Sequence, residues 1–452
     1  LLASGYSPEE ILEQVRQTEW GKILSDSPKR SSLFLGEKEK RGRALLQFRV
    51  DNFEPILPEA ISPGQQISNI FTKYILNAPY HASDFSELKI PLKILATDLL
   101  SGNKIIFDHG DLAQAVRSTV SIPLLFSPVV FGSLVLVDGG VLDNIPVDET
   151  RKAGSDIVIA MDTSSPLRSP ENLEAPWEIA DQITTIMQQE NDKMQLKNAD
   201  IVISFDDIKV ISTDFESIDR LFNEGVKRAK KKVAAIKQAI HSSHIDALAD
   251  ETVHIDEVKV EGVELTYLSQ FLNPTRSRFS IVEIHNAIER IYVSGDVDHI
   301  EAQILKHGLE TILLFKVNFN PIVESISFSG NGQLSNDSLF AIISPLLKKP
   351  VNPFRTRLVI ENIARAYRKK GFSLAAVDRI DYNQENHSAH FHIVEGLIQN
   401  INITGLKKTK NFVIDREFKV RAGELFQYNE AQNGLDNIIA TDLFSSVNLT
   451  VE

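Results

Sequence analysis

Over residues 8–240, short apolar runs rich in Ile, Val and Leu alternate with segments whose apolar residues recur at helical spacing. Such dense runs are typical of buried parallel strands, and their alternation with helices is typical of an α/β domain. The expected strands are 92–99, 104–107, 134–137, 156–161 and 200–205. The expected helices are 111–120, 146–153, 177–197 and 218–240. Residues 1–245 are therefore expected to form one α/β domain with a parallel-rich sheet covered by helices.

A different pattern begins near residue 252 and recurs. An alternating apolar/polar strand precedes a glycine at 258–262, 326–330 and 401–405, so these glycines are spaced by about seventy residues. Each copy continues with two helical segments and further strand, and self-similarity at a fixed period indicates a repeated supersecondary unit. We expect three α+β repeats of β-α-α-β-β order. They cover residues 252–320, 321–396 and 397–452, and the last is incomplete because the chain stops before its final strand.

Residues 28–75 interrupt the alternation in the first domain. This stretch combines a charged run with three prolines and scattered aromatic residues, which is typical of a long excursion over a sheet edge. Two interpretations stay open here, a lid over a binding site and an ordinary surface insertion.

Composition excludes several classes of function. The chain carries 61 acidic and 48 basic residues and a formal charge of −13, so it has no excess positive field for nucleic acid. The basic run at 227–232 is expected to be a solvated helix face. The chain has no cysteine and hence neither disulfides nor thiolate metal ligands. No apolar run reaches the length of a membrane-spanning helix.

The two ends of the chain both have the pattern of internal segments. The first residues carry neither an initiator Met nor a signal peptide, and residues 1–5 have the pattern of an apolar helix closed by Gly5. The last residues alternate like a strand but have no partner after them. We therefore expect a piece of a longer protein, truncated at both ends.

Asp138 is the main candidate for chemistry. It ends the expected strand 134–137 and is followed by Gly139 and Gly140. Open α/β folds bind ligands at the carboxyl ends of their strands, and glycines permit a sharp turn and close approach to the carboxylate. Taken alone, however, Asp-Gly-Gly is also an ordinary strand-to-turn signal.

The sequence around Asp138 resembles the carboxy-terminal signature of the patatin-like phospholipases. In that family A-[VIL]-R-A-S-x-S-I-P is followed by F-x-P-V and V-D-G-G-V-x-N-x-P-V, which residues 115–123, 126–129 and 137–147 follow closely. Ser118 and Thr119 depart from it, and neither is a catalytic position in the family. Further matches that carry the resemblance through about residue 240 are 96–102, 154–160 and 222–225.

The resemblance implies a three-layer fold and a lipid acyl hydrolase that acts on phospholipids or other lipid esters at a membrane surface. Its catalytic pair is a serine in a G-x-S-x-G turn and an aspartate that matches Asp138, with no cofactor or metal. An unperturbed aspartate is a weak base for a hydroxyl, so the pair needs desolvation and direct contact. The chain contains neither G-x-S-x-G nor the glycine-rich oxyanion loop. We expect both upstream of Leu1, and we expect these 452 residues alone to be inactive.

Other polar residues are weaker candidates. His81 and His109 are expected to be surface histidines. Asp143 and Asp148 are expected to cap or solvate the turn and the helix after it. No spacing of carboxylates or histidines indicates a metal site. Asn144 and Pro146 match positions of the family but are expected to shape the turn rather than to take part in the chemistry. Asp162 is a further acidic neighbour of Asp138 in sequence without an expected role in the chemistry.

The repeats resemble POTRA domains, which stand ahead of outer-membrane barrels. The strand-plus-glycine starts and the helix 360–370 with Gly371-Phe372 carry this resemblance, as does the weaker counterpart at 288–295. Leu57-Pro58 and Gly64-Gln65-Gln66 also resemble a segment of the outer-membrane patatins. This layout implies an outer-membrane-associated protein whose repeats lead to a barrel and bind extended peptides at a sheet edge. The alternative is a non-catalytic assembly or secretion factor with a degenerate patatin domain.

Overall fold

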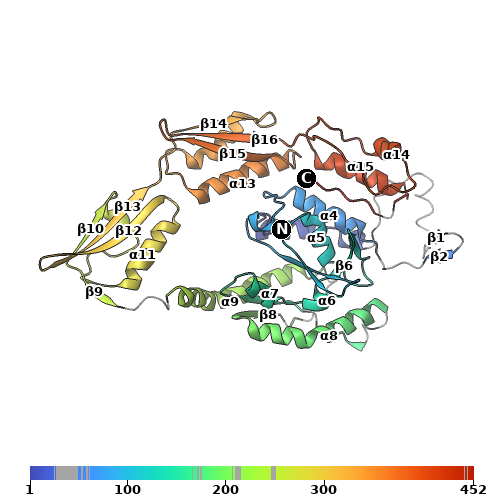
Figure 1. Cartoon of the computed structure of the whole chain (residues 1–452), viewed down its shortest axis with the longest axis horizontal. Coiled ribbons are helices and arrows are strands. Elements are labelled where there is room, and N and C mark those ends of the chain that lie inside the picture. The colour runs from blue at the N-terminus through green and yellow to red at the C-terminus, as the bar shows by residue number, and fades with distance from the viewer. Residues whose placement is uncertain are drawn as a thin grey trace. The chain divides into compact units, whose positions relative to one another are not determined.

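A computed structural model of the chain forms two compact units (Figure 1). Unit 1 comprises Leu1–Ala239 together with Leu397–Glu452, and unit 2 comprises Ile240–Gly396. The residues that the structure describes are 1–24, 26, 49–51, 54–56, 60, 62–164, 166–170, 173, 176–205, 207–208, 215–245, 251–441, 443–444 and 446–451.

The elements of unit 1 follow the expected alternation. Its helices are α1 (Pro8–Gln17), α2 (Trp20–Leu24), α4 (Gln65–Leu76), η2 (Phe85–Glu87), α5 (Leu112–Thr119), α6 (Gly140–Asp143), α7 (Val147–Lys152), α8 (Pro176–Asn198), α9 (Ile218–Ile245), α14 (Asn411–Glu417) and α15 (Tyr428–Ala440), and the last residues of α9 belong to unit 2. Its strands are β1 (Arg49–Asp51), β2 (Glu54–Ile56), β3 (Ile94–Asp98), β4 (Lys104–Phe107), β5 (Val129–Phe131), β6 (Leu134–Asp138), β7 (Ile159–Asp162) and β8 (Ile201–Ser204).

The excursion at 28–75 is described only in part. Its described part includes the antiparallel pair β1–β2 and the helix α4. Residues 28–48 lie outside the described residues, and so does most of the segment on which the lid interpretation depends. Leu57-Pro58 also lies outside them, whereas Gly64 and Gln65 begin α4.

The four-stranded sheet of unit 1 has the order β4-β3-β6-β5, and all its pairs are antiparallel. Parallel pairing in the described part of unit 1 is found between β7 and β8. The described sheet is thus less parallel than the apolar runs predict. For two of the three pairs the reason is local, because β3 and β4 are joined by the short turn 99–103, and β5 and β6 by residues 132–133. Such short connections permit only antiparallel neighbours.

One core cluster of unit 1 packs α5 against β3 and η2. Phe85 is fully buried within it and contacts a set of small and aliphatic side chains. Asp111 begins α5, since its carboxylate accepts the backbone N–H groups of Ala113 at 2.8 Å and Gln114 at 3.1 Å. The core cluster holds α5 against β3. β3 in turn pairs with β6, and β6 carries Asp138.

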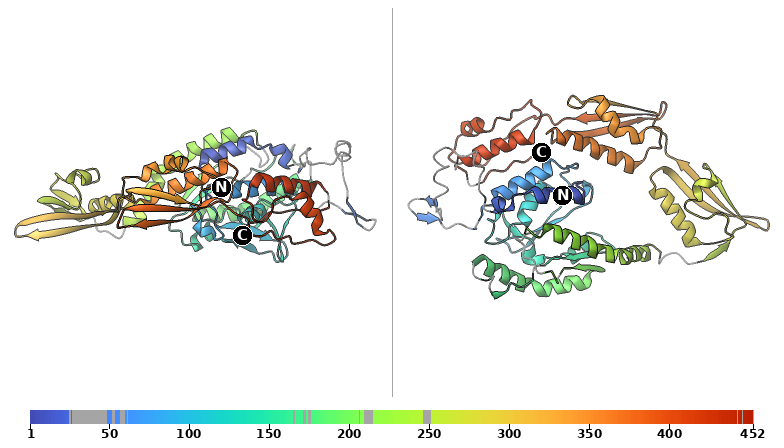
Figure 2. Two further views of the ribbon diagram at one scale, coloured as in Figure 1. Left: turned by 90° about the horizontal axis from the view of Figure 1, so that it is seen from above. Right: turned by 180° about the vertical axis from the view of Figure 1, so that it is seen from behind.

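Unit 2 contains two copies of one β-α-α-β-β arrangement. The elements of the first are β9 (Thr252–His254), β10 (Glu257–Glu261), α10 (Leu265–Leu268), β11 (Arg278–Ser280), α11 (Ile281–Val293), β12 (Val297–His307) and β13 (Glu310–Phe319). Those of the second are β14 (Ser325–Ser329), α12 (Asn336–Ile343), η4 (Ser344–Leu346), α13 (Pro353–Lys369), β15 (Ala376–Asn383) and β16 (Ser388–Val394). Figure 2 shows α11 and α13 each lying beside the sheet of its own copy.

The two sheets share one topology. Their orders are β10-β13-β12 and β14-β16-β15, in which the first strand is parallel to the central strand and the other pair is antiparallel. The core of the first copy surrounds fully buried Phe315 and Ile291 on the helix side of its sheet. The strand–helix–helix–strand–strand order of POTRA-like repeats is confirmed for the three-stranded sheets and helices of these two copies, and the first copy adds a separate antiparallel pair, β9–β11.

The recurring glycine has a steric cause. Gly262 and Gly330 have φ values of +89° and +79°, and a Cβ atom would lie 2.0 Å from the carbonyl oxygen of Val317 and 1.9 Å from that of Ile393, respectively. Both oxygens belong to the central strand of the sheet. The chain thus leaves the first strand by crossing close over the central backbone, and only glycine fits there.

The third repeat differs from its expectation. Residues 401–404 form no strand, and Gly405 has a φ of +80° with nothing within 4 Å of a Cβ position. Its helices are α14 and α15, and residues 446–451 are likewise not paired as a strand. The alternating pattern at 401–404 fails to form a strand because the described part of 397–451 provides no central strand corresponding to β13 or β16.

Candidate active site

Asp138 occupies the last position of β6, where the backbone is held on two sides. On one side, Ala96 of β3 lies opposite Asp138 in the sheet. On the other, the N–H of Asp138 donates to the carbonyl oxygen of Ser121 at 3.1 Å. One carboxylate oxygen, Oδ1, accepts the N–H of Gly140 at 2.8 Å. The side chain is therefore fixed at the strand end by its own turn.

Close contacts rather than a positive φ distinguish the two glycines after Asp138. Gly139 has a helical φ of −62°, but a Cβ atom there would lie 2.3 Å from the carbonyl oxygen of Leu95 in β3. A Cβ atom at Gly140 would lie 3.1 Å from Oδ1 of Asp138. The expected sharp turn is thus a helical start, at which the backbone of β3 leaves no room for a side chain at Gly139 and the carboxylate of Asp138 leaves a tight space at Gly140.

One face of α8 supports this turn through polar side chains. Gln188, Asp192 and Gln195 are spaced four and three residues apart, so they lie on the same side of the helix. Gln188 donates to the carbonyl oxygen of Gly140. Asp192 accepts from Asn144 at 3.1 Å. Gln195 donates to the Asp148 carboxylate at 3.0 Å and accepts the Asp148 N–H at 2.9 Å. Figure 1 shows α8 beside α6 and α7, the helices that carry these partners.

Burial shifts the pKa of Asp138. Desolvation raises the pKa of its carboxyl above the usual range for aspartate, and the N–H of Gly140 offsets only part of that rise. The pKa of nearby Asp192 is also raised, mainly by burial and further by the charges of Asp162 and Asp143. A carboxylate with a raised pKa is a stronger proton acceptor, which is the property that a general base near neutral pH requires.

Two neighbouring aspartates have structural roles different from those expected. Asp143 is 4% exposed rather than solvated. Its Oδ2 accepts from Lys104 at 2.9 Å, and that lysine also donates to Glu149 at 2.8 Å. Asp148 is bound by side chains of α8. Both residues fasten the helices after the turn, and neither is bonded to Asp138.

None of the remaining candidates, all of them described residues, is hydrogen-bonded to the carboxylate of Asp138. The His109 side chain is 82% exposed and bonds Asp108 at 2.6 Å, so it is a surface histidine as expected. His81 is also exposed and bonds the carbonyl oxygen of Ala78 at 3.0 Å. Asp162 accepts the N–H of Ser164 at 3.1 Å, and Pro146 precedes α7. Asn144 shapes the turn by joining α6 to α8.

Sequence reasoning missed the role of Arg117, which lies within the family signature. Its side chain is buried at 5% exposure in α5, a helix otherwise buried through small and aliphatic residues. Ser118, a departure from the family, is also buried, and its hydroxyl donates to the carbonyl oxygen of Gln114 at 2.9 Å. A lone arginine among small helix residues was a signal, and Ser121 and Ser127 are near it in sequence, but its partners Pro63 and Gly64 are more than fifty residues away.

Ser121 is the serine whose backbone contacts Asp138, but its hydroxyl is not available as a nucleophile. It is fully buried, donates to the carbonyl oxygen of Arg117 at 2.9 Å and accepts from the guanidinium of the same residue. Among the residues that the structure describes, no group of three or more His, Cys, Asp or Glu is arranged to hold a metal. Within the described residues, Ser121 is thus occupied by Arg117 and does not pair its hydroxyl with the Asp138 carboxylate.

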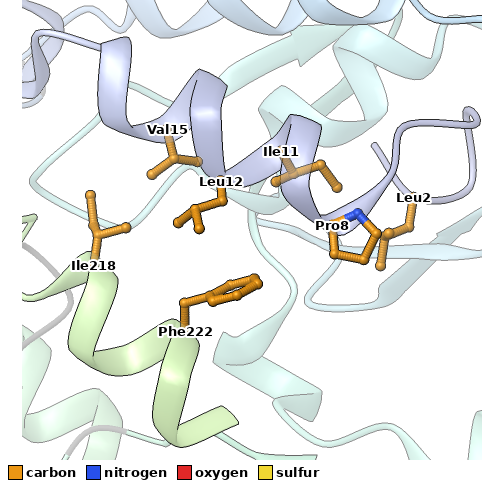
Figure 3. Close-up of a pocket in the computed structure, with 7 residues that line it drawn as sticks. All are labelled: Leu2, Pro8, Ile11, Leu12, Val15, Ile218 and Phe222. Atoms are coloured by element: carbon orange, nitrogen blue, oxygen red, sulfur yellow. The ribbon is translucent and has the colours of Figure 1, made fainter. Parts of the chain in front are cut away.

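Unit 1 also has an apolar cavity of about 300 Å³ between α1 and α9 (Figure 3). Ile11, Leu12 and Val15 of α1 face Ile218 and Phe222 of α9 across it. Its lining carries no charged or hydrogen-bonding side chain, so it offers no group for ester chemistry. In the described ranges, no helix is both long and apolar enough to cross a membrane.

Comparison with known proteins agrees with the resemblance expected for the amino-terminal part. Residues 1–151 match the family described as patatin-like phospholipase. An uncharacterized NTE family protein of Mycobacterium tuberculosis is 34% identical over 96 residues, which are 20% of this chain and 27% of that protein. Lysophospholipase NTE1 of Debaryomyces hansenii is 28% identical over 103 residues, 22% of this chain and 7% of that protein. The chain thus spans about a quarter or less of the length of these relatives.

Among solved structures, the chain is similar to the N-terminal domain of Omp85 from Thermosynechococcus elongatus. The TM-score is 0.38 at 21% identity, covering 45% of this chain and 92% of that one. POTRA1-3 of the periplasmic domain of Omp85 from Anabaena gives a TM-score of 0.36 at 20% identity, covering 45% and 91%, respectively.

Proposed function

Because residues 1–151 carry a patatin-like phospholipase domain and POTRA-like units follow it, we propose that Asp138 is the proton acceptor of a Ser-Asp pair that hydrolyses lipid esters. The observation that carries the proposal is the setting of Asp138. Its carboxylate stands at a strand end, has a pKa raised by burial, and is held by a turn in which Gly139 is sterically required and Gly140 is tightly packed.

The proposed chemistry is acyl transfer to a serine followed by hydrolysis. The serine hydroxyl attacks the ester carbonyl carbon while Asp138 accepts its proton, and the proton then passes to the leaving alkoxide. Water enters, Asp138 accepts a proton from it, and the acyl-serine is cleaved to a fatty acid and free serine. Backbone N–H groups of a glycine-rich loop would stabilise the oxyanion in both steps.

We propose that the serine and the oxyanion loop precede Leu1 in the parent polypeptide, since the 452 residues contain neither motif. The first test is to read the parent gene upstream for G-x-S-x-G. The second is to label the parent polypeptide and the 452-residue chain with a fluorophosphonate probe. We expect labelling of the parent alone. Ester turnover by the 452-residue chain above that of a heat-denatured control would contradict the proposal.

We further propose that the POTRA-like units connect this hydrolase to an outer-membrane barrel, so that the parent protein is associated with the outer membrane. The support is the repeated topology of unit 2, which matches the unit expected ahead of such barrels. Fractionation of a producing cell would test this. Recovery of the parent protein with the inner membrane or the cytosol would refute it.

The same units are proposed to bind extended peptides at a sheet edge. The edge strand β12 is paired with β13 on one side, and much of its length is exposed. An added strand would use its free backbone groups. Substituting Gln303→Pro in β12 should weaken peptide binding, because proline removes a donor and disrupts strand pairing. Undiminished binding of an extended peptide by this variant would argue against β12 as the edge.

A non-catalytic assembly or secretion factor is the second candidate. The rigid glycine-dependent turn at Asp138 favours the hydrolase, since a scaffold alone has no need for a desolvated carboxylate. An upstream sequence without the serine would favour the second candidate and overturn the first.

A further inference from the structure

Arg117 joins three segments of unit 1 through one buried guanidinium. Its Nη1 donates to the Ser121 hydroxyl, and its Nη2 donates to the carbonyl oxygens of Pro63 and Ser127, each at 3.2 Å. Its Nε lies 3.4 Å from the carbonyl oxygen of Gly64. Burial lowers the pKa of Arg117 to about 10, and the charge of Asp26 partly opposes this. A buried cation requires all its donors to be satisfied, so these acceptors are held in fixed relative positions.

The Asp138 turn lies at one end of this connection. Ser121, whose hydroxyl is bonded to Arg117, accepts the backbone N–H of Asp138 at 3.1 Å through its carbonyl oxygen. Movement of the guanidinium would therefore shift the residue on which the Asp138 backbone rests. Arg117 reaches Asp138 through one intermediate residue.

The other end is the first turn of α4, which holds the carboxy-terminal segment 397–451. Gly64 precedes α4, and a Cβ atom there would lie 2.0 Å from Nη2 of Arg117. The next residue, Gln65, pairs its side-chain amide with the backbone of Val447, donating to the oxygen at 2.6 Å and accepting the N–H at 2.9 Å. This two-point contact imitates pairing between two strands.

A second contact fixes the same segment one helical turn further along α4. The hydroxyl of Tyr428, the first residue of α15, lies 3.1 Å from the carbonyl oxygen of Asn69, and it shares its proton between this oxygen and the side-chain oxygen of Gln432. Tyr428 is 4% exposed and Gln65 is 8% exposed, so both contacts are made in a desolvated interface. Hydrogen bonds of this kind are costly to leave unmade once buried.

We propose that Arg117 is a positioning residue that couples docking of residues 397–451 on α4 to the setting of the Asp138 turn. The inference rests on the proposed function of Asp138 as the base, but its physical content is independent of catalysis. Loss of docking loosens the first turn of α4, the acceptors of Arg117 shift, and Ser121 holds the Asp138 backbone less firmly.

Amide hydrogen exchange on the 452-residue chain tests this without any catalytic assay. The reporter is the N–H of Asp138, read by site-resolved mass spectrometry. Gln65→Ala should speed its exchange about threefold to tenfold, the factor that corresponds to losing a typical hydrogen bond. Tyr428→Phe, which removes one hydroxyl from the far side of the interface, should act in the same direction. Unchanged exchange at Asp138 in both variants, with faster exchange in α15, would overturn the proposal.

The double variant separates coupling through Arg117 from general destabilisation. Arg117→Gln should itself speed exchange at Asp138, and adding Gln65→Ala to it should have little further effect there. If the two factors multiply instead, the coupling does not pass through Arg117. Arg117→Lys tests geometry, since a lysine keeps the charge but lacks the planar fork. Lysine should therefore fail to restore wild-type exchange, and full restoration would show that charge alone suffices.

Arg151→Gln is the matched control. Arg151 also lies in unit 1 and donates to the carbonyl oxygens of Asp156 and Asn198 and to the Asp200 carboxylate. Its loss should leave exchange at Asp138 unchanged, and an equal effect would refute a specific role for Arg117. Failure of the proposed hydrolase activity would leave these exchange results unaffected, so the two proposals can fail separately.

Discussion

Replacing Gly139 by alanine should destabilise unit 1, although the backbone at this position suits alanine. Gly139 has φ −62° and ψ −27°, which are ordinary helical values. The added Cβ, however, would lie 2.3 Å from the carbonyl oxygen and 2.7 Å from the carbonyl carbon of Leu95. That backbone belongs to β3, which is paired on both sides, so it cannot rotate away.

The magnitude follows from two opposed contributions. Overfilling a packed site costs about 1–3 kcal/mol. Restricting the unfolded chain by replacing glycine returns about 0.4–1 kcal/mol. We therefore expect a net loss of about 1–2 kcal/mol in the free energy of unfolding. For a unit of this size a loss of that order lowers Tm by roughly 2–6 °C.

Thermal unfolding followed by calorimetry measures this shift, with Gly225→Ala as the matched control. Gly225 lies inside α9 and has nothing within 4 Å of a Cβ position. Alanine is favoured over glycine in a helix interior by about 1 kcal/mol, so this variant should melt above the wild type. The reasoning is refuted if Gly139→Ala melts at or above the wild-type temperature, or if both variants shift in the same direction.

Three further variants test the packing and electrostatics described above. Gly330 and Gly405 share a positive φ, but only at Gly330 would an added Cβ clash with a central strand. In denaturant unfolding, Gly330→Ala should therefore lose about 1–3 kcal/mol more of the free energy of unfolding than Gly405→Ala. Equal losses would refute the steric argument. Because burial raises the pKa of Asp138, the folded chain holds that proton more tightly than the unfolded chain, and the stability from protonation is lost as pH rises through the folded pKa. Asp138→Asn should therefore stabilise the chain at pH 7 and lose this advantage towards pH 4, whereas lower stability at pH 7 would contradict the burial argument. Lys104→Ala leaves buried Asp143 without its cation and should lower the free energy of unfolding by about 1–3 kcal/mol, less than for a fully buried pair because the lysine is 34% exposed. Adding Asp143→Asn to this variant should restore part of the loss, and no recovery would count against the ion pair.

The order of elements was predictable because apolar spacing is a local property. The expected helix 177–197 is α8 at Pro176–Asn198, and the expected strand 134–137 is β6 at Leu134–Asp138. Strand direction was not predictable from the same spacing, since dense apolar runs suit either direction and short turns made β3–β4 and β5–β6 antiparallel. The third repeat shows the converse limit, because an alternating pattern at 401–404 forms no strand without a partner.

The site was predictable only where its residues are contiguous. Asp138, Gly139 and Gly140 stand together in sequence, and the structure adds the reason for each glycine. Gln188 is brought to the turn by tertiary packing of another helix, and Arg117 is bonded to the distant residues Pro63 and Gly64, so no local pattern marks these contacts. The desolvation that raises the pKa of Asp138 is likewise a property of the assembled fold.

The central claim is that Asp138 accepts the proton of a nucleophilic serine, and kinetics of Asp138→Asn in the parent polypeptide test it most directly. With a short-chain fluorogenic ester, kcat/KM should fall about 100-fold to 10,000-fold, the range typical for loss of a general base. Binding of the probe substrate should change little, because asparagine can still accept the N–H of Gly140. A kcat/KM near that of the wild type would show that Asp138 is not the base.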